Sequence, residues 1–166
     1  YDAIAKNVLQ GAFVGGGEAK NLRFGEVVKY ITDTWRVGNS YPFYVLMYKA
    51  KYNSLPQDIK EIFDALCGEY RERFALMWNA QDFDGRAFGK AHGVEYIELS
   101  DQEAKRWTEA VEPIIQDYIQ RMVSKGYKES EVRGWIQYLR ERTDYLTKKQ
   151  LALHISSVTG PPQFRP

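Results

Sequence analysis

A glycine-rich turn followed by an acidic side chain is the first place in this sequence where chemistry could be arranged. Gly15, Gly16 and Gly17 stand directly before Glu18. Glycine permits tight turns in which backbone N–H groups and a side chain face the same side, so Glu18 could face a cleft. An ordinary surface turn with a solvated Glu18 is the alternative. Lys20 stands where a dinucleotide fingerprint would need its third glycine, so no nucleotide site is predicted.

A second group of aromatic and polar side chains follows about twenty residues later. Trp35 and Tyr41 could stack on the apolar body of a small molecule, while Asn39 or the tyrosine hydroxyl orients its polar end. Arg36 is the cation of this segment and could pair with a carboxylate. Core packing for Tyr41 and a solvated position for Arg36 are the competing interpretations.

Several other kinds of chemistry lack support. The only histidines, His92 and His154, stand far apart without Cys or acidic neighbours at ligand spacing, and Cys67 is the only cysteine. We therefore predict no metal site, no cofactor, no nucleophilic residue set and no enzymatic activity. Asp82 and Asp84 are expected on a solvated helix face. The 23 Lys and Arg residues balance 22 Asp and Glu residues, so a nucleic-acid partner is not expected either.

One very long helix is expected among the elements that position these residues. Apolar side chains recur at helical spacing from Ile59 to Phe88. A helix from about Leu55 to about His92 would be roughly 55 Å long, whereas a compact domain of about 100 residues is roughly 35 Å across. Such a helix would serve two lobes. A break near Gly85, which would give two ordinary helices, is the alternative.

Capping signals indicate where two of the helices begin. Ser54 and Gln57 predict a capping box at the start of the long helix, with Pro56 in its first turn. Ser100 and Glu103 predict a second capping box and a helix that follows it.

The rest of the chain indicates short strands separated by helices. Tyr41–Lys49 is rich in aromatic and branched residues and gives the clearest strand signal. Further strands are predicted over 12–14, from about 29 to 34 and over 94–99, and helices over 4–9, near 24–29, from about 101 to 125 and from about 129 to 145. This order predicts a helix-rich α/β or mixed α+β protein.

Five segments, in this order, are similar to a known family. They are LQGAFVGGGE (9–18), GEVVKYITDT (25–34), MYK (47–49), KYNSLPQDIKEIFD (51–64) and IELSDQEAKRWTEAVEPIIQDYI (97–119). Over roughly residues 4–142 the chain resembles the C-terminal half of the DctP-type solute-binding proteins of tripartite ATP-independent periplasmic (TRAP) transporters. The resemblance departs at three positions, where Gly15, Tyr48 and Tyr52 replace the usual Asp, Asn and Trp.

The resemblance implies a fold and a function. The fold would be part of a two-lobe periplasmic binding protein of type II, with a long helix shared by both lobes and the N-terminal lobe missing. The function would be to bind a small organic acid, a carboxylate, in the cleft and to deliver it in the periplasm to the TRAP membrane permease subunits. The segments expected are a strand-rich part with the cleft loop (1–53), the long helix (54–93), a strand with helices (94–146) and a tail (147–166). The expected ligand-binding residues are Gly17, Glu18, Ala19, Trp35, Arg36, Asn39 and Tyr41.

The alternative function is that of a non-enzymatic helical interaction or structural protein. In that interpretation the aromatic stripe of the long helix pairs with another chain. It also predicts that this chain, on its own, forms a homo-oligomer through the long helix.

Overall fold

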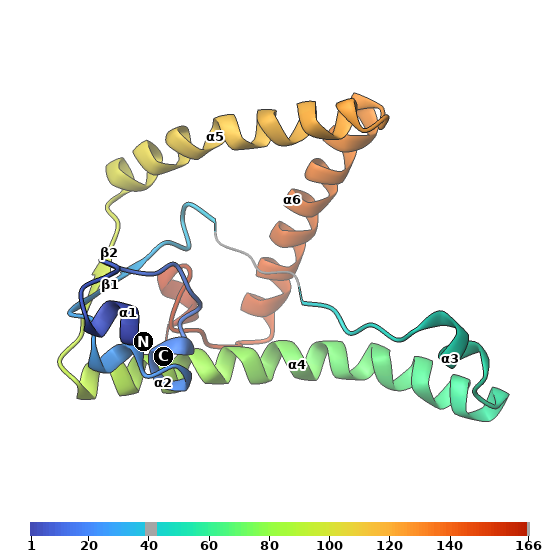
Figure 1. Cartoon of the computed structure of the whole chain (residues 1–166), viewed down its shortest axis with the longest axis horizontal. Helices are drawn as coiled ribbons and strands as arrows, with labels where there is room; N and C mark the ends of the chain where they lie inside the picture. Colours follow the sequence, from blue (N-terminus) through green and yellow to red (C-terminus); the bar gives the residue numbers. More distant parts are fainter. Residues whose placement is uncertain (39–42, 166) are drawn as a thin grey trace. The chain divides into compact units, whose positions relative to one another are not determined.

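The computed structural model in Figure 1 describes residues 1–38 and 43–165 of the chain. The elements in chain order are α1 (Asp2–Ala5), α2 (Glu18–Asn21), η1 (Phe24–Glu26), β1 (Tyr30–Asp33), α3 (Lys49–Asn53), α4 (Gln57–Ala91), β2 (Glu95–Glu98), α5 (Asp101–Ser124), α6 (Glu129–Ala152) and η2 (Pro162–Phe164). The prediction of a helix-rich fold with short strands is confirmed, and the two strands pair in a small parallel sheet. The chain divides into two compact units, Tyr1–Lys29 with Ser40–Glu95 and Tyr30–Asn39 with Tyr96–Pro166.

The predicted long helix is confirmed as α4, a single helix in the first unit. It contains 35 residues and runs through Gly85 without interruption, so the alternative of two helices is wrong. The predicted capping box at its start is also wrong. Ser54 instead ends the preceding helix α3, with its hydroxyl donating to the Lys51 carbonyl oxygen at 2.8 Å. Pro56 takes the N-cap position of α4 without a side-chain cap.

Two strands predicted for the first unit do not form within the residues that the structure describes. Residues 43–48 and 11–15 form neither helix nor strand. A strand needs a neighbouring strand to satisfy its backbone, and the sheet of the described chain pairs only β1 with β2. Aromatic packing takes the place of strand pairing at Phe43, whose ring lies 4.4 Å from the Trp78 ring and 5.9 Å from the Phe74 ring of α4, measured between ring centroids.

The second unit consists of the small sheet and two helices. Strands β1 and β2 form a two-stranded parallel sheet where strands were predicted. Ser100 is confirmed as the N-cap of α5, because its hydroxyl oxygen accepts a hydrogen bond from the Glu103 N–H at 3.2 Å. The helix ends before Gly126, as predicted, and this glycine has a φ of +94°.

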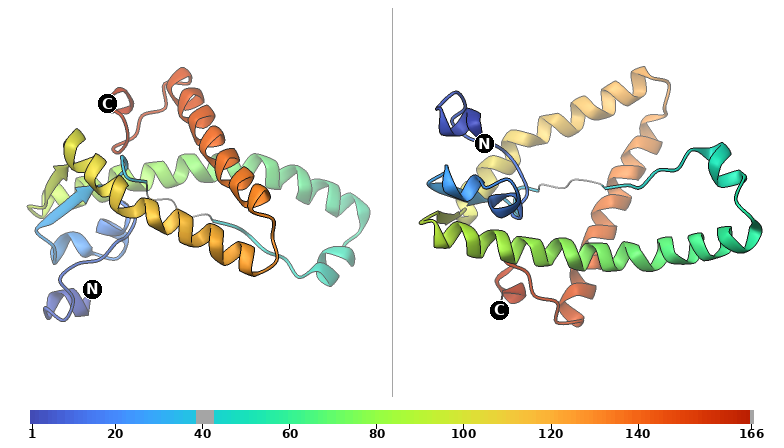
Figure 2. Two further views of the ribbon diagram at one scale, coloured as in Figure 1. Left: turned by 90° about the horizontal axis from the view of Figure 1, so that it is seen from above. Right: turned by 60° about the horizontal axis from the view of Figure 1, so that its bottom comes forward.

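Helix α6 is longer than predicted, since it continues to Ala152. Helices α5 and α6 diverge from the turn that joins them (Figure 2). The most deeply buried side chains of this unit are Ile119 of α5 and Val132 of α6.

No helix within residues 1–38 and 43–165 is both long and apolar enough to cross a membrane.

Candidate functional site

The glycine turn of residues 15–17 is packed directly on the backbone of α4. A Cβ atom added to Gly85 would lie 2.2 Å from the Gly16 carbonyl oxygen and 2.9 Å from the Gly17 Cα. Figure 1 shows α2, which follows the turn, beside the C-terminal part of α4. Gly85 is therefore the residue that lets the turn approach the helix, and α4 continues through it unbroken.

Two carboxylate side chains meet at this turn, one from each side. Glu18 is half-buried at the start of α2, and Asp82 is half-buried on α4. Glu18 Oε2 and Asp82 Oδ1 are each inaccessible to solvent and have no hydrogen-bond partner. Both oxygens lie close to glycines of the turn. A Cβ added to Gly15 would lie 2.6 Å from Glu18 Oε2, and a Cβ added to Gly16 would lie 3.0 Å from Asp82 Oδ1.

The electrostatic environment of Asp82 follows from this burial. Loss of solvation raises the pKa of the Asp82 carboxyl group, and the nearby negative charge of Glu18 raises that pKa further. The Gly17 N–H donates a hydrogen bond to the Asp82 carboxylate, which lowers the pKa and offsets part of the rise. Asp82 is thus a poorly solvated acid that is tied to the turn through the backbone.

The two aspartates of α4 lie in different surroundings. Asp84 is solvent-exposed, as predicted, and forms an ion pair with Lys20 of α2 at 2.7 Å. The expectation of a solvated position for Asp82 is wrong, because the glycine turn covers it. Beside this pair, the Asn21 side-chain amide donates to Gln81 Oε1 at 3.1 Å. These two contacts join α2 to α4 around the turn.

The predicted site residues Gly17, Glu18 and Ala19 differ in how far they are buried within the first unit. Gly17 and Ala19 are buried, and the Gly17 Cα faces α4, since a Cβ there would lie 3.3 Å from the Gln81 Cβ. Glu18 remains half-buried. Their contact with a ligand stays a prediction.

Two other predicted residues, Trp35 and Arg36, lie in the second unit directly after β1. The Arg36 guanidinium lies over the Trp35 ring, 5.1 Å from its centroid. Arg36 also forms an ion pair with Asp101, the first residue of α5. The structure thus brings Trp35 and Arg36 together in one unit and Gly17, Glu18 and Ala19 together in the other. The predicted residues Asn39 and Tyr41 lie outside the described residues.

Asp82 is the residue of this region that sequence reasoning missed. A usable signal was present, because Gly85 and Gly89 are spaced by four residues and so lie on one face of the helix. Both are buried. A glycine pair at this spacing inside a helix indicates close approach of another segment, and Asp82 lies one turn away from Gly85 on the same face.

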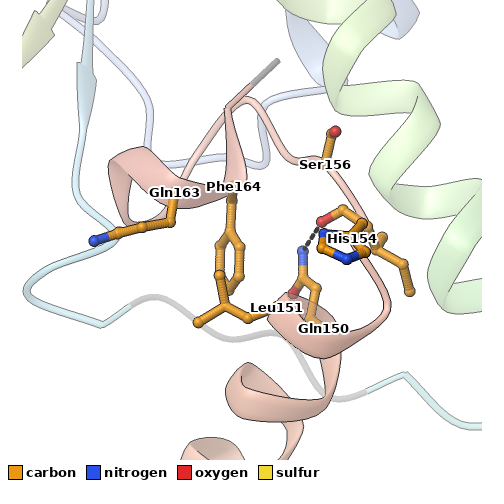
Figure 3. Close-up of a pocket in the computed structure, with 7 residues that line it drawn as sticks. Gln150, Leu151, His154, Ser156, Gln163 and Phe164 are labelled. Atoms are coloured by element: carbon orange, nitrogen blue, oxygen red, sulfur yellow. Dashed lines mark hydrogen bonds between the residues drawn. The ribbon is translucent and has the colours of Figure 1, made fainter.

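A hollow of about 170 Å³ lies at the end of α6. Figure 3 shows the Phe164 ring beside Leu151, and the Gln150 side-chain amide donating to the Ile155 carbonyl oxygen at 3.2 Å. None of the predicted site residues lines this hollow.

Across residues 1–38 and 43–165, no three His, Cys, Asp or Glu side chains are grouped so that they could hold a metal ion.

A comparison with protein families identifies the chain's relatives. The model of the family "DctP: Bacterial extracellular solute-binding protein, family 7" matches residues 1–121 of the 166 residues. The chain belongs to the DctP family. Membership implies an extracytoplasmic, periplasmic solute-binding role in TRAP transport, and proteins of this kind are generally not enzymes. The matched region includes the glycine turn, all of α4 and the Trp35–Arg36 pair, whereas α6 and the hollow follow it.

Proposed function

We propose that this DctP-family chain binds a small organic acid through its carboxylate and delivers it to the membrane permease subunits of a TRAP transporter. The observation that carries this proposal is the family match over residues 1–121. The ion gradient would drive uptake by the permease, and the solute-binding protein would supply the captured acid. The proposed architecture is a two-lobe protein whose cleft holds the ligand and whose long helix, α4, belongs to both lobes.

Arg36 is the residue of the second unit best suited to a carboxylate. A guanidinium presents paired N–H groups that match the two oxygens of a carboxylate. Arg36 already holds a carboxylate in this structure, that of Asp101, whose side chain is 92% exposed. An exposed ion pair contributes little stability, about 0–1 kcal/mol, so a ligand carboxylate could replace Asp101 at small cost. The Trp35 ring beneath Arg36 offers an apolar surface for the body of the acid.

Gly17, Glu18 and Ala19 are proposed as the contribution of the first unit. Their carbonyl and carboxylate groups are hydrogen-bond acceptors, so they suit donors such as hydroxyl groups on the acid. Asn39 and Tyr41 are proposed as further ligand contacts.

Calorimetric titration of the full chain with a panel of mono- and dicarboxylates tests this function. The Arg36→Met variant should bind the preferred acid about 10- to 100-fold more weakly, the range expected for losing a charged hydrogen-bond pair. Arg106→Met is the matched control, because Arg106 also pairs with an exposed acid of the same unit, Glu103, at 2.8 Å. Unchanged affinity of the Arg36→Met variant would exclude Arg36 from the site. Failure of every carboxylate to bind the unmodified chain would contradict the proposed ligand class.

A second candidate function, self-association through α4, is favoured by one observation. Large apolar side chains on the first two-thirds of this helix are exposed: Ile59, Ile62, Leu66, Tyr70 and Phe74. A contiguous apolar face of this kind is typical of an interaction surface. Sedimentation equilibrium should show a homo-oligomer that Ile62→Lys converts to monomer, whereas a stable monomer across the concentration range would exclude this candidate.

A further inference from the structure

Residues 44–48, with the sequence YVLMY, belong to the longest run of exposed large apolar side chains in the part of the chain that the structure describes. Val45 is 96% exposed, and Tyr44, Leu46 and Tyr48 are exposed nearly as strongly. A run of this kind is uncommon on a folded protein and marks a place where another molecule can bind.

The main chain of this segment is as accessible as its side chains. Residues 43–48 lie in neither a helix nor a strand. No main-chain N–H or C=O group of residues 44–47 is hydrogen-bonded to a described residue. Tyr48, directly before α3, has extended dihedral angles, with φ at −61° and ψ at 127°. A partner can bind such a main chain through backbone hydrogen bonds while its pockets take alternate side chains.

Both ends of the segment are held on α4. Phe43 precedes the segment, and its ring centroid lies 4.4 Å from that of Trp78. Helix α3 follows the segment, and its Tyr52 hydroxyl group lies 2.8 and 2.9 Å from the two carboxylate oxygens of Asp64 on α4. Figure 1 shows the stretch before α3 as a plain trace without helix or strand. A break within residues 44–48 would therefore leave both new ends attached to the same helix.

Other exposed residues of the same types are protected by helical structure. Tyr138 and Leu139 are each 63% exposed, and both lie inside α6. A protease binds its substrate as an extended main chain, so a helix must first open locally before one of its peptide bonds can be cut. Residues 44–48 need no such opening.

Each compact unit is assembled from both sides of this segment. The first unit contains residues 1–29 and 40–95, and the second contains residues 30–39 and 96–166. In the first unit, α2 packs on α4 beyond the segment. In the second unit, β1 pairs with β2. These contacts do not require an intact peptide bond within residues 44–48.

We propose that residues 44–48 are a processing site, at which an endoprotease with a pocket for a large apolar side chain cuts the chain and leaves the two fragments associated. In this hydrolysis, water adds to the carbonyl carbon, the C–N bond breaks, and the products are a new carboxylate and a new amine. The bond after Leu46 is the best placed, because residues 44–46 precede it and residues 47 and 48 separate it from α3. The site requires no ligand, so it goes beyond the proposed function.

Limited digestion of the full chain with chymotrypsin tests the proposal, because this protease has a hydrophobic slot for the residue before the cut bond. Mass spectrometry of the fragments should place the first cut within residues 44–48, before any cut at Tyr138 or Leu139 of α6. The cut chain should then elute from gel filtration as one species in native buffer and as two separate fragments in urea.

A variant of the segment tests the contribution of its side chains. The triple variant Tyr44→Ser, Leu46→Ser and Tyr48→Ser removes three side chains that the slot can bind, so the first cut should become at least about tenfold slower. Tyr138→Ser is the matched control, since it removes an exposed tyrosine from a helix. It should leave the rate of the first cut unchanged.

A first cut outside residues 44–48 would overturn the processing site, as would an equal rate of cutting for the triple variant and the unmodified chain. Separate elution of the fragments in native buffer would overturn their association. The position of the first cut in the unmodified chain decides the matter even if the triple variant fails to fold. Because no ligand is present, a failure of this proposal is distinguishable from a failure of carboxylate binding.

Discussion

The two ends of α4 are built in opposite ways. Its C-terminal part carries the buried glycines Gly85 and Gly89 and packs against the glycine turn, α2 and η1. Its N-terminal two-thirds carries large apolar side chains such as Ile62, which is 56% exposed, and Tyr70, which is 58% exposed. The hydrophobic residues on which the helix prediction rests are therefore mostly outside the packed region, and the tightest packing lies where the side chains are smallest.

This contrast shows how little the apolar pattern of a helix says about where it packs. Backbones approach one another closely only where Cβ atoms are absent. At Gly85 the contact is made by main-chain atoms of residues 16 and 17. The stability of this contact therefore depends on the close fit of the two backbones and not on the area of apolar side chain that is buried. Substitutions along α4 can test this difference, and they follow in order of decreasing expected effect.

The largest effect is expected for Gly85→Ala. The added methyl group would lie 2.2 Å from the Gly16 carbonyl oxygen and 2.9 Å from the Gly17 Cα, and these main-chain atoms have little freedom to move. We expect the free energy of unfolding to fall by about 3 kcal/mol, the upper end of the usual cost of overpacking. Urea denaturation followed by circular dichroism measures this change.

Gly68→Ala is the matched control, in the same helix. No atom lies within 4 Å of a Cβ at this position, so alanine should stabilise the helix by about 0.5–1 kcal/mol through its better helix propensity. Equal effects of the two substitutions would remove the distinction between the ends of α4.

A smaller loss is expected for Gly25→Ala, on the η1 side of the same contact. A Cβ there would lie 3.0 Å from Phe88 Cδ1 and 3.2 Å from both the Gly89 Cα and the Ala19 carbonyl oxygen. The Phe88 ring can shift but the main-chain atoms cannot, so we expect a loss of about 1–2 kcal/mol in the same denaturation experiment. A neutral result would show that η1 moves away from α4 without cost.

The ion pair at the packed end should contribute less than the glycine contacts. Lys20 and Asp84 are both substantially exposed. Lys20→Met should therefore cost only about 0.5 kcal/mol, and the cost should vanish at about 1 M salt because the charges are screened. Thermal unfolding at low and high salt measures both values, and a loss that persists at high salt would mean that the Lys20 side chain acts through packing.

The smallest effect is expected at the exposed end, for Ile62→Ala. Little apolar area is removed from contact, and alanine has the better helix propensity, so the unfolding free energy should change by less than about 0.5 kcal/mol. Urea denaturation at several protein concentrations makes the measurement. A larger loss of unfolding free energy that depends on protein concentration would mean that the apolar face around Ile62 is covered in solution. It would favour self-association through α4.

Local signals in the sequence were reliable where one element could be judged by itself. The helical spacing of apolar residues located α4, and Ser100 was correctly predicted to cap α5. Prediction failed where an element depends on a neighbour. Tyr41–Lys49 has strand-forming residues, yet no strand pairs with residues 43–48 in the described chain. Ser54 has the type and spacing of a helix cap, but its hydroxyl is used by α3.

The candidate site shows the same division. The sequence placed Gly17, Glu18 and Ala19 at a turn, and Trp35 and Arg36 after a strand, because these features involve residues that are near in the chain. That Arg36 pairs with Asp101 was not predictable, since 65 residues separate them. The covering of Asp82 by the glycine turn was missed for the same reason.

The sequence was thus sufficient for the helix-rich class, the long helix and the strands β1 and β2, and five similar segments were sufficient for the family resemblance, because each is expressed in the order of residues along the chain. Folding alone decided that Gly85 is a contact and not a break, and that Asp82 is covered while Asp84 is exposed. The physical reason is that solvation and close approach depend on which distant segment lies against a residue. A carboxylate has the same chemistry at positions 82 and 84, and only the turn packed over one of them makes the two behave differently.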